Sequence, residues 1–187
     1  MSVPPSVLAA RTTAELLFDA ETVLKAIDQL AVRLTVELAD ENPLLISVLN
    51  GGLAFTGALM QRLVFPLELT CLHVGRYGRD TRGGELIWHA RPDVPVADRH
   101  VVFVDDILDH GVTLASLAAW AREERARSVT TVVLVDKTIE GERPIEPDYA
   151  ALVCPDRYLF GWGMDFEGYW RNLTAIYALA PDAEEGS

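Results

Sequence analysis

Apolar residues recur at helical spacing near the start of the chain and form short continuous runs further on. A helix from residue 23 to 38 is predicted by apolar side chains three or four positions apart, at Val23, Ile27, Leu30, Leu34 and Leu38. Pro43 disfavours helix at the residue before it, so the helix must end in the segment DENP. The apolar run LLISVLN at 44–50 then predicts a buried strand, and residues 53–64 predict a second helix after a glycine turn.

The alternation of strands and helices continues through the middle of the chain. Further strands are predicted at 67–74, 100–106 and 128–137, and a helix at 113–126 separates the last two. A polar, glycine-broken segment at 75–85 predicts a mobile loop. Strands that alternate with helices imply right-handed crossovers. The predicted fold class is therefore α/β, with an open, mainly parallel twisted sheet flanked by helices.

The length and composition of the chain favour one compact unit. Half of the 187 residues are apolar, which is enough to bury one core, so we predict a single domain over residues 1–187. Its core is expected at about 20–153. The segment after the core is aromatic, glycine-rich and irregular, and we expect it to form a small hood from about 154 to 180 together with the N-terminal segment.

The chain is acidic, with a formal net charge of −12 and a pI near 4.7. Such a field repels nucleic-acid phosphates and anionic lipids, so neither is expected as a partner. No run approaches the roughly 20 apolar residues that span a bilayer, and the N-terminus lacks the pattern of a secretory signal. We therefore expect a cytoplasmic protein. Cys71 and Cys154, the two cysteines, are expected to be buried free thiols.

Polar residues and glycine stand at the carboxyl ends of three predicted strands. Asp105 and Asp106 end one strand, Lys137 ends another, and Asn50 and Gly51 close the first. In an open parallel sheet, ligands bind in the crevice beyond the carboxyl ends of the strands. We therefore expect these residues at the functional site.

The segment DHGVT, from Asp109 to Thr113, has the features of an anion-binding loop. Gly111 allows a tight turn, and successive backbone N–H groups converge at the start of a helix. The neighbouring carboxylates would repel an anion unless they faced a different part of the ligand. We therefore predict a composite ligand such as a sugar phosphate, with Mg²⁺ bound by Asp105 and Asp106.

The whole segment VVFVDDILDHGVTL resembles the phosphoribosyl-pyrophosphate signature of the type I phosphoribosyltransferases. That signature is an apolar strand, two acidic residues, two apolar residues, then Asp, Thr, Gly, any residue and Thr. His110 departs from it, since the family usually has threonine there. The resemblance implies phosphoribosyl pyrophosphate as a substrate and a homodimer or homotetramer as the assembly. It also implies that the phosphoribosyl group and its 5′-phosphate are bound by Asp105, Asp106, Asp109, His110, Gly111, Val112 and Thr113.

Lys137 in VLVDKT and the segment PDRYLFGWGMDFEGYWRNL at 155–173 resemble the hypoxanthine-guanine branch of this family, its bacterial members in particular. The resemblance implies that Lys137 contacts a 6-oxopurine, and an ammonium group suits that acceptor because it only donates hydrogen bonds. It further implies that Tyr158 stacks on the purine and that the backbone of Leu159 contacts the edge of the base.

The same resemblance assigns the pyrophosphate side of the site. Asp165 would help to bind Mg²⁺, and Arg171 would contact pyrophosphate. VLNGG matches the family's pyrophosphate turn at Gly51, although Asn50 stands where several relatives carry lysine.

A closing lid is the last element that the resemblance implies. Arg76 and Tyr77 stand at the place of the family's usual Ser-Tyr pair. The implied reaction joins purine N9 to ribose C1 as pyrophosphate leaves, which would form IMP or GMP in purine salvage. Asp109 could accept the proton of purine N7 as the catalytic general base.

Three alternatives stay open. Within enzymes, the base could be xanthine or another oxo base. A regulator that keeps this fold and binds RNA, as the pyrimidine attenuation proteins do, is disfavoured by the acidic charge. A phosphoacceptor signalling domain is disfavoured because its acidic pair would follow the first strand, whereas Asp105 and Asp106 follow the third.

Overall fold

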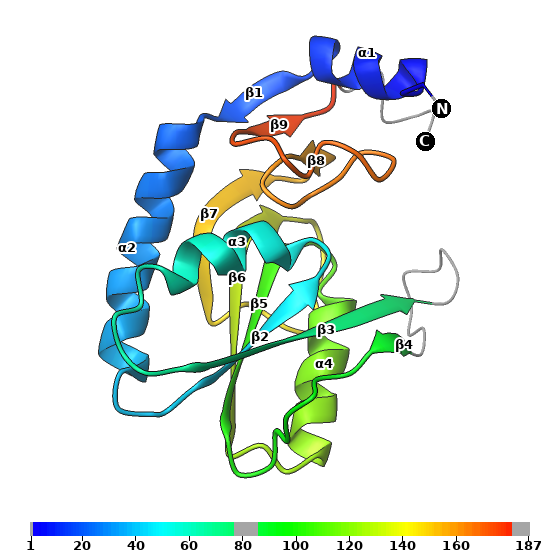
Figure 1. Ribbon diagram of the computed structural model, residues 1–187. Helices are drawn as coiled ribbons and strands as arrows, with labels where there is room; N and C mark the ends of the chain where they lie inside the picture. Colours follow the sequence, from blue (N-terminus) through cyan, green and yellow to red (C-terminus); the bar gives the residue numbers. More distant parts are fainter. Residues whose placement is uncertain (1, 77–85, 181–187) are drawn as a thin grey trace.

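The computed structural model in Figure 1 describes residues 2–76 and 86–180. In this part of the chain the helices are α1 (Pro5–Thr13), α2 (Ala20–Leu38), α3 (Gly52–Met60) and α4 (Val112–Glu123). The strands are β1 (Glu15–Phe18), β2 (Leu44–Leu49), β3 (Glu68–Arg76), β4 (Leu86–Ala90), β5 (His100–Leu108), β6 (Ser128–Thr138), β7 (Tyr149–Pro155), β8 (Leu159–Phe160) and β9 (Ile176–Ala178). No helix among these described residues is long and apolar enough to cross a membrane.

The larger sheet has six strands in the order β4-β3-β2-β5-β6-β7. All neighbours in it pair in parallel except β3 and β4, which form an antiparallel edge. Strands β5, β6 and β7 are built from nearly continuous apolar or β-branched runs, as expected where both faces of a parallel sheet are covered. The predicted fold class, a mainly parallel open sheet flanked by helices, is confirmed.

Helices cover both faces of this sheet (Figure 1), so the core has two layers. On one face, the apolar sides of α2 and α3 pack against alternate residues of the strands, such as Val102 and Val104. On the other face, α4 packs against the residues between them, such as Val101 and Phe103. This alternation follows from the period of two along a strand. The packing of helices on both faces fixes the position of the strands and therefore of their carboxyl ends.

Segments from both ends of the chain form a second layer above those carboxyl ends (Figure 1). Strands β1, β9 and β8 make a small antiparallel sheet in that order. Helix α1 packs beside it, and Val7 and Phe160 are fully buried in a small separate core. We call this layer, residues 2–18 and 156–180, the hood. The carboxyl ends of the sheet strands therefore face the hood.

Several element boundaries differ from those predicted. Strand β5 continues two residues past the paired aspartates, because Ile107 and Leu108 pair with β6. Helix α3 ends at Met60 rather than near residue 64, where the chain turns ahead of Pro66. The prediction that both cysteines are buried was wrong for Cys71, which lies near the open edge of the sheet and is exposed.

Candidate active site

A pocket of about 290 Å³ lies beyond the carboxyl ends of β2 and β5. Its walls come from four segments: the end of β2, Val74 of β3, the stretch from β5 into α4, and the hood. The lining residues that the sequence had singled out are Gly51, Asp105, Asp106, Asp109, His110, Gly111, Val112, Thr113 and Arg171. We call this cavity the loop pocket.

The loop that gives this pocket its name is held in a shape suited to anions. Gly111 has φ +74° and caps the start of α4, so it occupies the left-handed region that favours glycine. A Cβ atom there would meet Ile145 Cγ2 at 3.2 Å and its carbonyl oxygen at 3.3 Å, so the turn packs closely on the β6–β7 connection. The N–H groups of the first turn of α4 have no partners within the helix. They supply a positive end to the pocket.

Asp105 and Asp106 form the acidic side of the loop pocket. The Asp106 N–H donates to Asp105 Oδ1 at 2.9 Å. Burial, together with the negative charge of Asp106, raises the pKa of Asp105 well above its usual value. Burial also raises the pKa of Asp106, although a hydrogen bond with Asp105 and the charge of Arg171 oppose that rise. A neighbouring cation would relieve this unfavourable pair.

Gly51 packs directly against the acidic pair. A Cβ atom at Gly51 would lie 2.0 Å from Asp106 Oδ2, and a Cβ atom at Gly163 in the hood would lie 2.0 Å from the Gly51 carbonyl oxygen. The segments that carry Gly51, Asp106 and Gly163 are distant in the sequence, and they therefore pack so closely that neither glycine has room for a side chain. Asn50 is different: its side chain is exposed, and it does not line the pocket. The peptide bond between Leu49 and Asn50 is cis.

A second pocket of about 190 Å³ adjoins the first and lies under the hood. The two pockets share Asp106, Ile107 and Asp109 as a common wall. The other residues that line it are Lys137, Tyr158, Leu159, Met164 and Asp165. We call it the lysine pocket. The structure therefore brings Lys137, Tyr158 and Leu159 together, although they come from the core and the hood.

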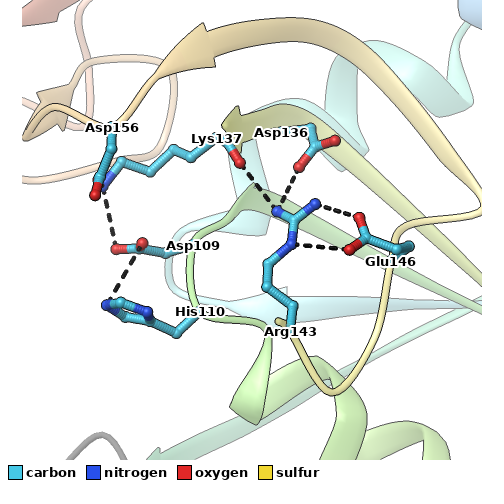
Figure 2. A network of polar contacts seen from close by, with 7 residues as sticks. All are labelled: Asp109, His110, Asp136, Lys137, Arg143, Glu146 and Asp156. Carbon is cyan, nitrogen blue, oxygen red and sulfur yellow. Dashed lines mark hydrogen bonds and ion pairs between the residues drawn. The ribbon is translucent and has the colours of Figure 1, made fainter. Parts of the chain in front are cut away.

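Lys137 joins these pockets to a network of charged groups (Figure 2). Its Nζ atom lies 3.2 Å from Asp109 Oδ2 and 2.8 Å from Asp156 Oδ1. Burial lowers the pKa of Lys137, but the hydrogen bond to Asp156 and the charge of Asp109 more than offset it, so the pKa is raised. The ammonium group is therefore charged at neutral pH. Asp109 Oδ1 is buried and accepts no hydrogen bond within the described part of the chain; His110 Nε2 lies 3.9 Å from it, too far for a hydrogen bond (Figure 2).

Tyr158 forms one side of the lysine pocket. Its ring meets the Phe166 ring edge to face at 5.9 Å, and its hydroxyl donates to the Asp165 carbonyl oxygen at 3.1 Å. Burial and the nearby Asp165 charge raise the pKa of Tyr158, so the phenol is neutral at pH 7. Tyr158 as a whole is 40% exposed and lines the lysine pocket.

Asp165 and Arg171 form an ion pair in the hood. Arg171 Nη2 lies 2.5 Å from Asp165 Oδ1, and Nη1 donates to the Gly163 carbonyl oxygen at 2.6 Å. Arg171 lines the loop pocket whereas Asp165 lines the lysine pocket. Of the predicted magnesium ligands, Asp165 is paired with Arg171 and shares the lining of the lysine pocket with Asp106. Of the predicted lid residues, Arg76 is the last residue of β3, and Tyr77 lies outside the described residues.

The sequence reasoning overlooked two parts of this network. Asp156 follows β7 directly, so its place at a strand end was the signal that could have revealed it. Arg143 lies on the β6–β7 connection, donates to Asp136 Oδ1 at 2.7 Å and pairs with Glu146 (Figure 2). It also donates to the Lys137 carbonyl oxygen at 3.0 Å. Arg143 thereby ties this connection, which supports Gly111, to the end of β6.

Comparison with known proteins agrees with this geometry. Residues 13–167 match the family model described as the phosphoribosyl transferase domain. The chain belongs to the phosphoribosyltransferase family. Among curated relatives of this family, it is 33% identical to the hypoxanthine-guanine phosphoribosyltransferase of Bacillus subtilis, over 91% of this chain and 96% of the relative.

Solved structures of phosphoribosyltransferases share the fold over nearly the whole chain. A hypoxanthine-guanine-xanthine phosphoribosyltransferase superimposes with a TM-score of 0.80 at 30% identity, covering 88% of this chain and 96% of the other. The hypoxanthine phosphoribosyltransferase of Trypanosoma cruzi, in complex with the product IMP, gives a TM-score of 0.82 at 30% identity, over 91% and 97% of the chains. The type I phosphoribosyltransferase fold expected from the signature is confirmed.

Proposed function

We propose that this phosphoribosyltransferase transfers the 5-phosphoribosyl group of phosphoribosyl pyrophosphate to N9 of hypoxanthine or guanine, giving IMP or GMP and pyrophosphate. One observation carries the proposal: an anion-binding pocket and a lysine pocket adjoin and share Asp106 and Asp109. A nucleotide has the same division into phosphate, ribose and base. The names of the relatives, which are hypoxanthine-guanine phosphoribosyltransferases, support the choice of substrates.

The loop pocket would hold the phosphoribosyl group. The 5′-phosphate would accept hydrogen bonds from the backbone N–H groups of residues 110–113 and lie at the positive end of α4. Because these donors are backbone groups, the replacement of threonine by His110 keeps them. The ribose hydroxyls would face Asp105 and Asp106, and Arg171 would contact the departing pyrophosphate. Gly51 would allow the pyrophosphate close approach to the backbone, with Asn50 at its rim.

The lysine pocket would hold the purine. Lys137 would donate a hydrogen bond to the 6-oxo group. Adenine could not accept this hydrogen bond, because its 6-amino group is itself a donor. Tyr158 would stack on the ring, and the backbone of Leu159 would contact its edge. Xanthine also carries a 6-oxo group, so a base panel is required to separate the three oxopurines.

Asp109 would act as the general base. It lies in the wall shared by the two pockets, and its Oδ1 is buried without a hydrogen-bond donor within the described residues. The Asp109 carboxylate would accept the N7 proton of the purine as N9 bonds to the ribose carbon and the bond from that carbon to pyrophosphate breaks. The carboxylates of the shared wall would stabilise the positive charge that develops on the sugar.

The acidic pair fits a magnesium ion. Two adjacent carboxylates with raised pKa values provide the hard oxygen ligands that Mg²⁺ prefers, and this ion is commonly held by one or two carboxylates plus substrate oxygens and water. In the described residues, no group of three or more His, Cys, Asp or Glu could hold a metal. Asp105 and Asp106 would therefore bind it together with substrate, and Asp165 would assist. Mg²⁺ would neutralise charge on the leaving pyrophosphate.

The test is a direct assay. Protein, Mg²⁺ and phosphoribosyl pyrophosphate are mixed with hypoxanthine, guanine, xanthine or adenine, and nucleotide formation is followed by absorbance. We expect turnover with hypoxanthine or guanine and none with adenine. Turnover with xanthine alone would change the assigned base, and no turnover with any oxopurine would overturn the proposal.

A regulatory RNA-binding role is the second candidate from a different class. The net charge of −12 disfavours it, because RNA binding gains most of its affinity from phosphate neutralisation. Filter binding at low salt tests this role directly. The homodimer or homotetramer that the resemblance implies stays a prediction, which sedimentation velocity measures.

A further inference from the structure

Asp156 is the carboxylate that lies nearest to the ammonium group of Lys137. Its Oδ1 lies 2.8 Å from Lys137 Nζ, whereas Asp109 Oδ2 lies 3.2 Å away. The Lys137 side chain is only 9% exposed, but that of Asp156 is 54% exposed and contributes no lining to either pocket. Figure 2 shows Lys137 extending between the two carboxylates. Asp156 therefore contacts the lysine from outside the site.

The contact with Asp156 affects how many N–H donors of Lys137 remain for a ligand. Lysine has three N–H donors and no acceptor. Asp109 and Asp156 can each accept one of them, which would leave the third for a ligand in the lysine pocket that Lys137 lines. Without Asp156, Asp109 would be the one carboxylate among the described residues that pairs with the ammonium group. The lysine would then be free to turn toward Asp109 and away from the base.

Asp156 is itself held firmly. It comes one residue after β7, whose Cys154 and Pro155 pair with Lys137 and Thr138 of β6. On its other side, Arg157 donates to Glu15 at 2.5 Å and to the Leu179 carbonyl oxygen at 2.6 Å. The segment is thus fixed to the core and to the hood.

From these contacts we infer that Asp156 is a positioning residue that sets the selectivity for 6-oxopurines by orienting Lys137. The inference rests on the proposed function, because it assigns the free Lys137 donor to the 6-oxo group. Asp156 does not touch the ligand. Its effect is expected only where the ligand offers an acceptor at position 6.

The experiment compares two nucleotides by calorimetry. Inosine 5′-monophosphate carries the 6-oxo group, and purine riboside 5′-monophosphate lacks it. A hydrogen bond to a charged group contributes about 1.5–3 kcal/mol, so the wild type should prefer the first nucleotide by about 10–100-fold. In Asp156→Ala we expect that preference to fall at least about fivefold, mainly through weaker binding of inosine monophosphate. The KM for phosphoribosyl pyrophosphate should stay unchanged.

Two controls separate positioning from a general effect. Glu142→Ala removes an equal charge from an exposed position on the β6–β7 connection and should leave the preference at the wild-type value. In a Lys137→Met background, Asp156→Ala should cause no further loss, because residues that act through one another are not additive. Should Asp156→Ala fail to fold by circular dichroism, Asp156→Asn removes the charge at nearly constant volume and is measured in its place.

The outcomes distinguish the inference from the proposed function. Equal preference in the wild type and in Asp156→Ala overturns the inference alone. An effect of Asp156→Ala that persists in the Lys137→Met background also overturns it, because the residue would then act by another route. A wild type that does not distinguish the two nucleotides overturns both this inference and the assignment of Lys137 to the base.

Discussion

Gly51→Ala is the substitution that tests the site most directly. Gly51 has φ −61° and ψ −48°, a helical conformation that alanine adopts without strain. The added methyl group would nevertheless lie 2.0 Å from Asp106 Oδ2 and 2.4 Å from Asp106 Cγ. The perturbation therefore acts on one carboxylate and not on the backbone.

The magnitude follows from these distances. Contacts of Cβ below 3.0 Å are essentially never found, so the Asp106 carboxylate must move by about 1 Å or more. A misplacement of about 1 Å in a catalytic site can cost about 10²-fold in rate. The overpacking costs about 1–3 kcal/mol of folding free energy, and the loss of glycine returns about 0.5–1 kcal/mol. A protein of this size should then lose less than about 10 °C in Tm.

The assay combines steady-state kinetics with thermal denaturation. We expect kcat/KM to fall about 10²-fold in a variant that still melts cooperatively. Gly57→Ala is the matched control: Gly57 lies on α3, and a Cβ atom there meets nothing within 4 Å. It should leave kcat/KM unchanged and slightly raise Tm. A folded Gly51→Ala enzyme with kcat/KM within about threefold of the wild type would refute a role for Asp106 in the site.

Three further predictions concern the charged residues. Asp109→Ala should fold and form nucleotide about 10²–10⁴-fold more slowly, and normal turnover in stopped assays would exclude it as the general base. Lys137→Ala should bind hypoxanthine and guanine about 10–100-fold more weakly by calorimetry, and equal affinity would remove Lys137 from the base site. Because the pKa of Asp105 is raised in the folded state, the native protein binds more protons than the unfolded chain, and stability is lost as pH rises through that raised pKa. Metal-free Asp105→Asn should therefore have a higher Tm than the wild type at pH 7.5, and the gain should vanish below about pH 4, where both states are protonated. If the increase in Tm of Asp105→Asn over the wild type, measured in EDTA, did not change with pH, the raised pKa of Asp105 would not be its cause.

The central sheet and half of the site could be predicted from the sequence because they are local. Asp105, Asp106 and the loop through Thr113 come from one continuous segment, so the apolar run that ends in acidic residues and a glycine loop was enough to locate them within two residues of the end of a strand. The mainly parallel pairing and the helices that flank the sheet also follow from the alternation of strands and helices, whereas the order of the strands was not predicted. The position of Lys137 at the end of β6 needed the same reasoning.

The rest depends on contacts between distant segments. The hood joins β1 to β9, more than 150 residues apart, and no periodic pattern marks such short strands. The Arg171–Asp165 pair and the approach of Gly163 to Gly51 arise only when this layer closes over the sheet. Asp156 was missed for a related reason: its importance comes from Lys137, which lies on the adjacent strand β6 and not nearby along the chain.

The acidic character of the site makes metal and substrate binding interdependent. Asp105 and Asp106 are adjacent, share a hydrogen bond and have raised pKa values, so ionising both without a cation costs free energy. In the proposed site, the helix N-terminus of α4 would attract the phosphate, but the carboxylates would repel it. A bound Mg²⁺ would remove that repulsion, and a bound phosphoribosyl pyrophosphate would complete the oxygen ligands of the ion. Each ligand should therefore raise the affinity for the other, because linkage is reciprocal. Binding of phosphoribosyl pyrophosphate in EDTA should be much weaker than in Mg²⁺, and in Asp105→Asn this difference should shrink.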